Sequence, residues 1–325
     1  MKSIKNTVLS ALAAATLALL AGCSKPAPQI SIGINAWPGS EFIYLAKVKG
    51  FYAKRGVEVK LVSFSSLADA RRSFELGHLD GIACTLVEHC QILDNSDRNP
   101  QIALVLDYSA GGDVVIAREG IRSSDQLAGA RIGLEAESLG VFILARLLEQ
   151  ASLSLRDVVP VKSDQLSLKR QMENGEIDVA ITYPPHSLSI SELKGARTIF
   201  TSAEIPNEVL DVLAFDADLI ARNEDAVRAI ISAIYEAQAW ARDNEAVAYA
   251  IMAEREGISP NEFKSILEND LQLTYQEDQA KFFEGEALLS KALERCDAIL
   301  HETGQSQKVP RFQGTFSRTL YLGSR

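Results

Sequence analysis

The chain has 325 residues, of which 47% are hydrophobic and 23% charged, and its formal net charge is −10. This length and composition indicate a globular protein with one large or two medium domains. The acidic balance argues against nucleic-acid binding, because phosphate contacts need clustered Lys or Arg and the sequence has no long basic run.

The first 22 residues have the pattern of a secretion signal. Two lysines precede an apolar run at 7–20, which is too short for a membrane-spanning helix and ends in small residues. The run closes with Leu20-Ala21-Gly22-Cys23, which resembles a bacterial lipobox. We therefore predict a lipoprotein signal peptide over 1–22, acylation of Cys23 with palmitate, and a tether over 23–29. A plain signal peptide with a chance cysteine is the alternative.

The next part of the chain alternates strands and helices. We predict a strand at 30–35, a helix at 41–55 that Gly56 stops, and a strand at 57–62. The pattern continues with a helix that begins near Ser65 and Ser66, a strand at 80–83, a helix at 85–94 and a strand at 102–106. This alternation indicates a mainly parallel sheet with helices on both faces.

A run of small residues, Ser109-Ala110-Gly111-Gly112, predicts a hinge, because a backbone with little side chain can bend easily. A second series of strands and helices is expected after it. Its strands are predicted at 114–117, 131–134, 158–161, 179–181 and 198–200, with helices at 138–151 and 164–174. An apolar strand at 209–215 would then return to the first unit.

The chain is predicted to be helical from Asp216 onward. Helices are expected to begin at Asp216, Asn223 and Ser259, and an amphipathic helix is expected over 278–301. These patterns predict lobe 1 from 30–110 plus 214–303, lobe 2 from 111–213, and a C-terminal tail over the surface at 304–325.

Four segments resemble the N-terminal part of solute-binding proteins of nitrate/sulfonate/taurine-type ABC importers, a superfamily that includes binders of thiamine-pyrimidine precursors. They are Ala36-Trp37-Pro38-Gly39, Tyr44-Leu45-Ala46, the run at 49–59 and the run at 75–80. The resemblance implies an α/β fold of the type II periplasmic binding proteins, with two lobes, a hinge and a ligand cleft between them. It also implies an ABC permease as partner.

Ligand-binding residues are expected at the carboxyl ends of the strands, where open α/β sheets bind ligands. The candidates are Trp37, Gly39, Tyr44, Ser65, Ser66, Thr85, Asp107, Tyr108, Ser109, Gly111, Glu137, Ser138, Leu139, Gly140, Tyr183 and Pro184. Structural roles stay open for several of them. The aromatic side chains could pack, Thr85 and Ser138 could cap helices, and Glu137 could serve only a helix dipole.

The charge of these loops argues against an anionic ligand. Glu135 and Glu137 lie where a helix start that binds an oxyanion should be least acidic, and neighbouring loops carry Glu41, Asp107 and Asp113. We therefore expect a neutral or cationic ligand with a flat ring, such as a pyrimidine-like vitamin precursor, rather than nitrate or a simple sulfonate.

No catalytic residue, metal site or cofactor is expected. Cys84, Cys90 and Cys296 form no CxxC motif, and Cys84 and Cys90 are predicted to be small buried side chains rather than a redox pair. No nucleophile elbow is present either.

These patterns predict a lipid-anchored monomer on the periplasmic or extracellular face of the cell membrane, which feeds an ABC permease. Ser24 follows the lipid cysteine, which leaves sorting to an outer membrane open. Two alternatives remain: a ligand sensor that signals to a membrane receptor, and an enzyme similar to the pyrimidine-precursor synthases.

Overall fold

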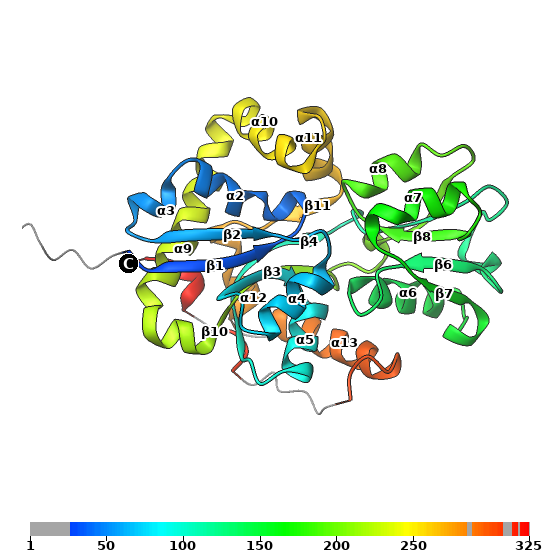
Figure 1. Ribbon diagram of the computed structural model, residues 1–325, viewed down its shortest axis with the longest axis horizontal. Helices are drawn as coiled ribbons and strands as arrows, with labels where there is room; N and C mark the ends of the chain where they lie inside the picture. The colour runs from blue at the N-terminus through cyan, green and yellow to red at the C-terminus, as the bar shows by residue number, and fades with distance from the viewer. Residues whose placement is uncertain (1–26, 285–287, 308–313, 318, 325) are drawn as a thin grey trace, which may run out of the picture.

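The computed structural model describes residues 27–284, 288–307, 314–317 and 319–324. The predicted signal peptide, the predicted lipobox with Cys23 and most of the predicted tether lie outside the described residues. The described chain forms two lobes, each built on one β-sheet with helices on both faces (Figure 1). The predicted α/β fold with two lobes is confirmed.

The sheet of lobe 1 has six strands in the order β11-β4-β10-β3-β1-β2. Its strands are β1 (Gln29–Ile34), β2 (Glu58–Ser63), β3 (Gly81–Thr85), β4 (Pro100–Ser109), β10 (Leu210–Asp216) and β11 (Leu271–Leu273). β1 pairs in parallel with β2 and β3, whereas β10 runs antiparallel between β3 and β4. The helices around it are α2 (Glu41–Val48), α3 (Phe51–Lys54), α4 (Leu67–Glu75), α5 (Leu86–Asn95), α9 (Ala217–Asp243), α10 (Glu245–Glu256), α11 (Pro260–Asn269), α12 (Ala280–Phe283) and α13 (Leu288–Glu302).

The sheet of lobe 2 has five strands in the order β7-β6-β8-β5-β9. They are β5 (Val114–Ala117), β6 (Arg131–Leu134), β7 (Val159–Lys162), β8 (Val179–Thr182) and β9 (Arg197–Thr201). Its helices are α6 (Leu139–Gln150), α7 (Gln165–Glu173) and α8 (His186–Ser191). β6 pairs in parallel with β7 and β8, and β5 pairs antiparallel with β8 and β9.

The chain crosses between the two sheets at 110–113 and again at 202–209. The predicted small-residue run forms the first crossing, where Gly111 has a φ of 141°, a conformation that favours glycine. The lobe boundaries at 110 and 214 stay predictions, and β10 already belongs to the first sheet from Leu210.

The predicted continuous helix over 278–301 is wrong. The structure has a short 3-10 helix (Gln276–Asp278), then α12, then α13. α12 ends because Glu284 has an extended backbone, with φ −117° and ψ 155°. Phe282 and Phe283, directly before this break, are both fully buried, so tertiary packing outweighs the helical pattern here.

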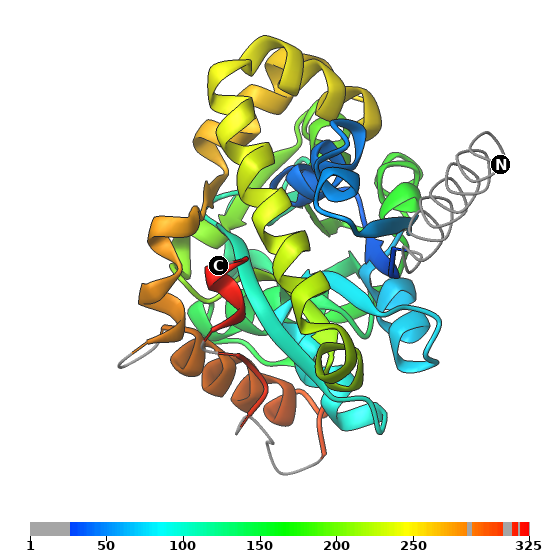
Figure 2. The same cartoon turned by 90° about the vertical axis from the view of Figure 1, so that its left-hand side faces the viewer.

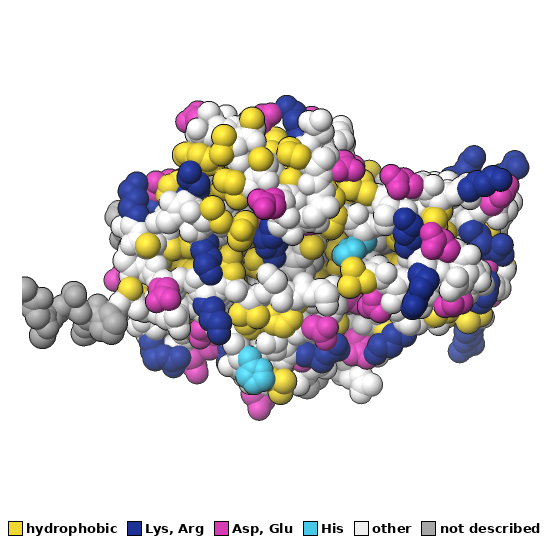
Figure 3. Space-filling model, turned by 45° about the horizontal axis from the view of Figure 1, so that its top comes forward, with side chains coloured by type: hydrophobic (Ala, Val, Ile, Leu, Met, Phe, Trp, Pro, Cys, Tyr) yellow, Lys and Arg dark blue, Asp and Glu magenta, His cyan; other side chains and the backbone are white. Residues whose placement is uncertain are grey.

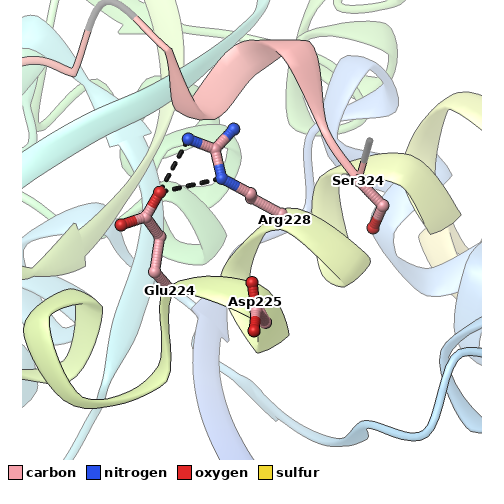
Figure 4. Close-up of a pocket in the computed structure, with 4 residues that line it drawn as sticks. All are labelled: Glu224, Asp225, Arg228 and Ser324. Carbon is pink, nitrogen blue, oxygen red and sulfur yellow. Dashed lines mark hydrogen bonds and ion pairs between the residues drawn. The ribbon is translucent and has the colours of Figure 1, made fainter.

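The described residues of the predicted C-terminal tail pack against lobe 1, and some of them are buried there. Leu320 and Tyr321 are buried, and the Tyr321 ring stacks on Phe283 with centroids 5.0 Å apart. The segment lies against α9 (Figure 2), where Arg228 donates a hydrogen bond to the Thr319 carbonyl at 2.7 Å. Glu224, Asp225, Arg228 and Ser324 line a hollow at this contact (Figure 4), so the C-terminal segment is part of the folded lobe.

In the part of the chain that the structure describes, every helix is too short or too polar to cross a membrane. Cys84 and Cys90 are buried and free, as predicted, and Cys296 is buried and free as well.

Candidate functional site

Two small adjoining cavities lie where the lobes meet. Each has a volume of about 10 Å³, room for roughly one water molecule, and they share Asp113, Leu139 and Tyr183 in their walls. The remaining wall residues are Asn35, Trp37, Leu67, Thr85, Glu135, Ser138, Gly140, Ile143, Gln165, Ile181, Thr182 and Asp211. The first cavity has walls from both lobes and lies in the inter-lobe cleft, whereas the second adjoins it and is lined by residues of lobe 2 alone.

Six of the predicted ligand-binding residues line these cavities. They are Trp37, Thr85, Ser138, Leu139, Gly140 and Tyr183. Two others, Ser65 and Ser66, line an outer groove of about 320 Å³ together with residues of lobe 2 such as Lys162. Residues that are far apart in the sequence thus lie close together at the carboxyl ends of the strands.

Several other candidates lie away from the cavity walls. Tyr108 packs against Phe282 of α12, with ring centroids 6.5 Å apart. The Tyr44 ring lies under the Arg255 guanidinium at 5.5 Å. Pro184 is buried beside Tyr183 but lines neither cavity.

Glu137 also lies outside the cavities and is half exposed. Its carboxylate lies 3.7 Å from Arg71 and 3.5 Å from Arg72, both on α4, and 3.6 Å from Lys162. It therefore forms ion pairs across the cleft rim. Ser109 and Gly111 belong to the chain crossing.

Trp37 is both a packing residue and a wall of the first cavity. It is buried, and its Nε1 donates a hydrogen bond to Asp107 Oδ1 at 3.0 Å. A Cβ on Gly39 would lie 2.0 Å from Asp107 Oδ2, so only glycine permits this approach. Trp37 meets Tyr183 edge to face, with ring centroids 6.2 Å apart, so aromatic rings from both lobes meet at the cavity.

The two predicted helix caps differ. Thr85 does cap α5, since its Oγ1 accepts a hydrogen bond from the Val87 amide at 3.1 Å. Ser138 makes no side-chain cap on α6 and instead donates its hydroxyl to Glu88 Oε1 at 2.7 Å. Glu88 belongs to lobe 1, so this bond joins the lobes.

The cavity walls are acidic. Burial raises the pKa of Asp113 and of Glu135 to about 7, and it raises the pKa of Asp211 well above the usual range. Asp107, behind Trp37, has its pKa raised to about 7, chiefly by burial. No Lys or Arg is among the described residues that line either cavity.

The surface has a different charge pattern from the cleft. On the face shown in Figure 3, acidic and basic side chains are interspersed over both lobes. Among the described residues, no group of three or more His, Cys, Asp or Glu side chains is placed to hold a metal ion.

The sequence patterns do not single out several wall residues. Asn35, Gln165 and Asp211 are missed, and Glu88 behind the wall is missed as well. The sequence holds a signal for two of these residues, Asp211 and Glu88. Asp211 is a charged residue inside the apolar strand at 209–215, and Thr85-x-x-Glu88 is a capping-box pattern.

The model of the NMT1-like family matches residues 24–254. The chain belongs to the NMT1-like family. This match covers most of lobe 1 and all five strands of the sheet in lobe 2. A protein of Brucella abortus (strain 2308), named as a candidate binding protein, is 25% identical over 254 residues, which cover 74% of this chain and 75% of the relative.

Solved structures share the fold of this NMT1-like protein. The periplasmic aliphatic sulphonate binding protein SsuA from Escherichia coli matches with a TM-score of 0.74 and 16% identity, over 90% of this chain and 99% of that chain. The desulfurization enzyme DSZB matches with a TM-score of 0.67 and 14% identity, over 90% of this chain and 97% of that chain. The predicted resemblance to sulfonate- and nitrate-type binding proteins is confirmed at the level of family and fold.

Proposed function

We propose that this protein is a lipid-anchored, extracytoplasmic solute-binding protein of an ABC import system. Its ligand is a small neutral or cationic molecule with a ring, such as a vitamin precursor. The two cavities carry the proposal, because carboxylates and aromatic rings line them and no basic side chain does. Membership of the NMT1-like family and the fold shared with periplasmic binding proteins support it.

The proposed mechanism is closure of the lobes around the ligand. Trp37 and Thr85 of lobe 1 face Leu139 and Tyr183 of lobe 2 across one cavity, so a bound molecule would contact both lobes at once. Such contacts stabilise the closed state relative to the open one, and the permease would recognise the closed state. Each cavity has a volume of only about 10 Å³ in this structure, so the lobes must separate before a molecule larger than water can enter.

The ligand is tested by mass spectrometry of small molecules released from the purified protein. A thermal-shift screen of vitamins, amines, nitrate, taurine and alkanesulfonates follows, because a ligand that binds only the folded state raises the melting temperature. We expect neutral or cationic ring compounds to respond. Micromolar binding of nitrate, taurine or an alkanesulfonate in calorimetry would contradict the proposed ligand class.

The anchor is tested at Cys23. Mass spectrometry of the mature N-terminus should find acylation at Cys23, and Cys23→Ala should move the protein from the membrane fraction to the soluble fraction. Membrane retention of the Cys23→Ala variant would contradict the lipid anchor.

Coupling to a permease is tested by asking whether neighbouring genes encode an ABC permease, or by a pull-down of this protein from membranes. Recovery of an ABC permease would support the proposal. Recovery of a receptor kinase or cyclase instead would favour the sensor alternative. An enzyme that uses a thiol nucleophile is disfavoured. Burial raises the pKa of the Cys84 thiol, and a hydrogen bond with Cys90 together with burial raises the pKa of the Cys296 thiol, so the nucleophilic thiolate is suppressed. Turnover of the bound compound by the purified protein would favour an enzyme.

A further inference from the structure

Glu88 of lobe 1 reaches the N-terminus of α6 in lobe 2. Its side chain is fully buried. Oε1 accepts hydrogen bonds from Ser138 Oγ at 2.7 Å and from the Leu139 amide at 3.0 Å, while Oε2 accepts from Thr85 of its own helix. Both carboxylate oxygens are therefore occupied, one of them by the start of a helix in the other lobe.

Glu135 makes the reciprocal contact. It follows β6 of lobe 2, is 6% exposed, and its Oε1 accepts a hydrogen bond from the Ala68 amide at 3.0 Å. Ala68 lies in the first turn of α4 in lobe 1. Each lobe thus supplies a carboxylate to a helix N-terminus of the other lobe.

These positions matter because helix N-termini attract anions through their free amide groups and the helix dipole. α4 and α6 both point such an end at the cleft, and in each case a carboxylate of the protein already satisfies an amide. An anionic ligand would have to displace a buried carboxylate and then stay close to Asp113 and Asp211. An anionic ligand is therefore disfavoured at the N-termini of both α4 and α6.

We propose that Glu88 and Glu135 determine the charge specificity of the cleft, and that the ligand carries a protonated amine that Glu135 receives. This inference rests on the proposed function and narrows its ligand class. Glu135 Oε2 has no hydrogen-bond partner although it is buried, and Glu135 lines the second cavity. An ammonium group would donate a hydrogen bond to this oxygen, and its positive charge would pair with the carboxylate.

The role of Glu88 is tested by chemical rescue with formate. Glu88→Ala leaves the Leu139 amide and the Ser138 hydroxyl without their acceptor, and we expect a melting temperature lower by about 3–6 °C. Sodium formate at 50 mM should restore at least a third of that loss, whereas sodium chloride at equal ionic strength should not. Glu88→Gln retains an acceptor and should show no formate response.

The matched control is Glu262→Ala in α11. Glu262 forms the same kind of capping box with Ser259, but it is exposed and lies in one lobe. Neither this variant nor the wild type should respond to formate. A folded Glu88→Ala variant, verified by circular dichroism, that ignores formate would overturn the role of Glu88, as would an equal formate response of Glu262→Ala.

The role of Glu135 is tested with benzylamine and benzoate, which share a ring and differ in charge. Benzylamine at 20 mM should raise the melting temperature of the wild type by at least 2 °C, and benzoate should not. Glu135→Gln should weaken benzylamine binding at least tenfold, and Glu88→Ala should gain a response to benzoate. A wild type that benzoate stabilises as much as benzylamine, or that neither probe stabilises, would overturn the ammonium assignment. Solute release in mass spectrometry tests the proposed function separately, so the two can fail independently.

Discussion

Ser109 Oγ and Ser202 Oγ lie 2.7 Å apart, and this hydrogen bond joins the two chain crossings between the lobes. Ser109 ends β4 and Ser202 follows β9. Both side chains are buried, and Ser202 Oγ also accepts a hydrogen bond from the Gly111 amide at 2.8 Å. Any motion that separates the lobes must bend the chain at this point.

Ser202→Ala is expected to destabilise the protein by about 1–3 kcal/mol, because it leaves the partly buried Gly111 amide without its acceptor. The variant should also occupy a wider range of lobe angles. Urea unfolding measures the first effect, and small-angle scattering of the ligand-free protein measures the second. Ser189→Ala in α8, whose hydroxyl bonds only within its own helix, is the control and should change neither measurement. An unchanged unfolding midpoint in Ser202→Ala would contradict the importance of this bond.

Tryptophan fluorescence should report ligand binding through Trp37. The chain has 2 tryptophans, and Trp240 lies on α9 next to Lys49, away from the cavity walls. Trp240→Phe leaves Trp37 as the single tryptophan, and its emission should shift when a ligand enters the cleft. Trp37→Phe should abolish the shift. A ligand-dependent change that follows Trp240 instead would place the ligand elsewhere.

Gly39→Ala is expected to disturb the site, because its Cβ would lie 2.0 Å from Asp107 Oδ2 and would push Asp107 away from Trp37. We expect a loss of about 1–3 kcal/mol in the free energy of unfolding and at least tenfold weaker ligand binding. Gly129→Ala is the control. Its φ is +76° with open space around it, so the substitution strains the backbone by roughly 1–2 kcal/mol without touching the cleft. Ligand binding, measured by calorimetry, should be normal in the control.

The acidic cleft should give the protein a characteristic pH dependence. Burial raises the pKa of Asp113 to about 7, above the value near 3.8 expected in the unfolded chain. The folded state therefore holds a proton between about pH 4 and 7 that the unfolded state has lost, and stability declines as the pH rises through this window. Asp113→Asn removes this contribution, so its unfolding free energy should decline less steeply from pH 5 to 8. Equal slopes in denaturant titrations of both proteins would contradict the raised pKa.

The same titration predicts proton release on binding. A cationic ligand favours the ionised carboxylates, so binding should tighten as the pH rises from 6 to 8. Calorimetry in two buffers of different ionisation enthalpy measures the released protons directly. Uptake of protons would contradict a cation in this cleft.

Local sequence patterns were enough to predict most of the fold. The small residues around Gly111 mark the first crossing. The mainly parallel sheet is only partly found, because β10 and β5 each pair antiparallel with both of their neighbours. A prediction failed where packing decided the outcome. Phe282 and Phe283 are buried at a break in the expected helix. The buried Tyr321 ring stacks on Phe283 and so holds the C-terminal segment against lobe 1.

The sequence by itself determined the fold class, the strand-end position of the cleft and its acidic character, because periodicity and residue charge are local properties of the chain. Only the tertiary structure decided which carboxylates share the cleft. Glu88 and Ser138 are 50 positions apart, and Glu135 and Ala68 are 67 apart. No local pattern encodes such pairs, since they form only when two lobes fold and meet.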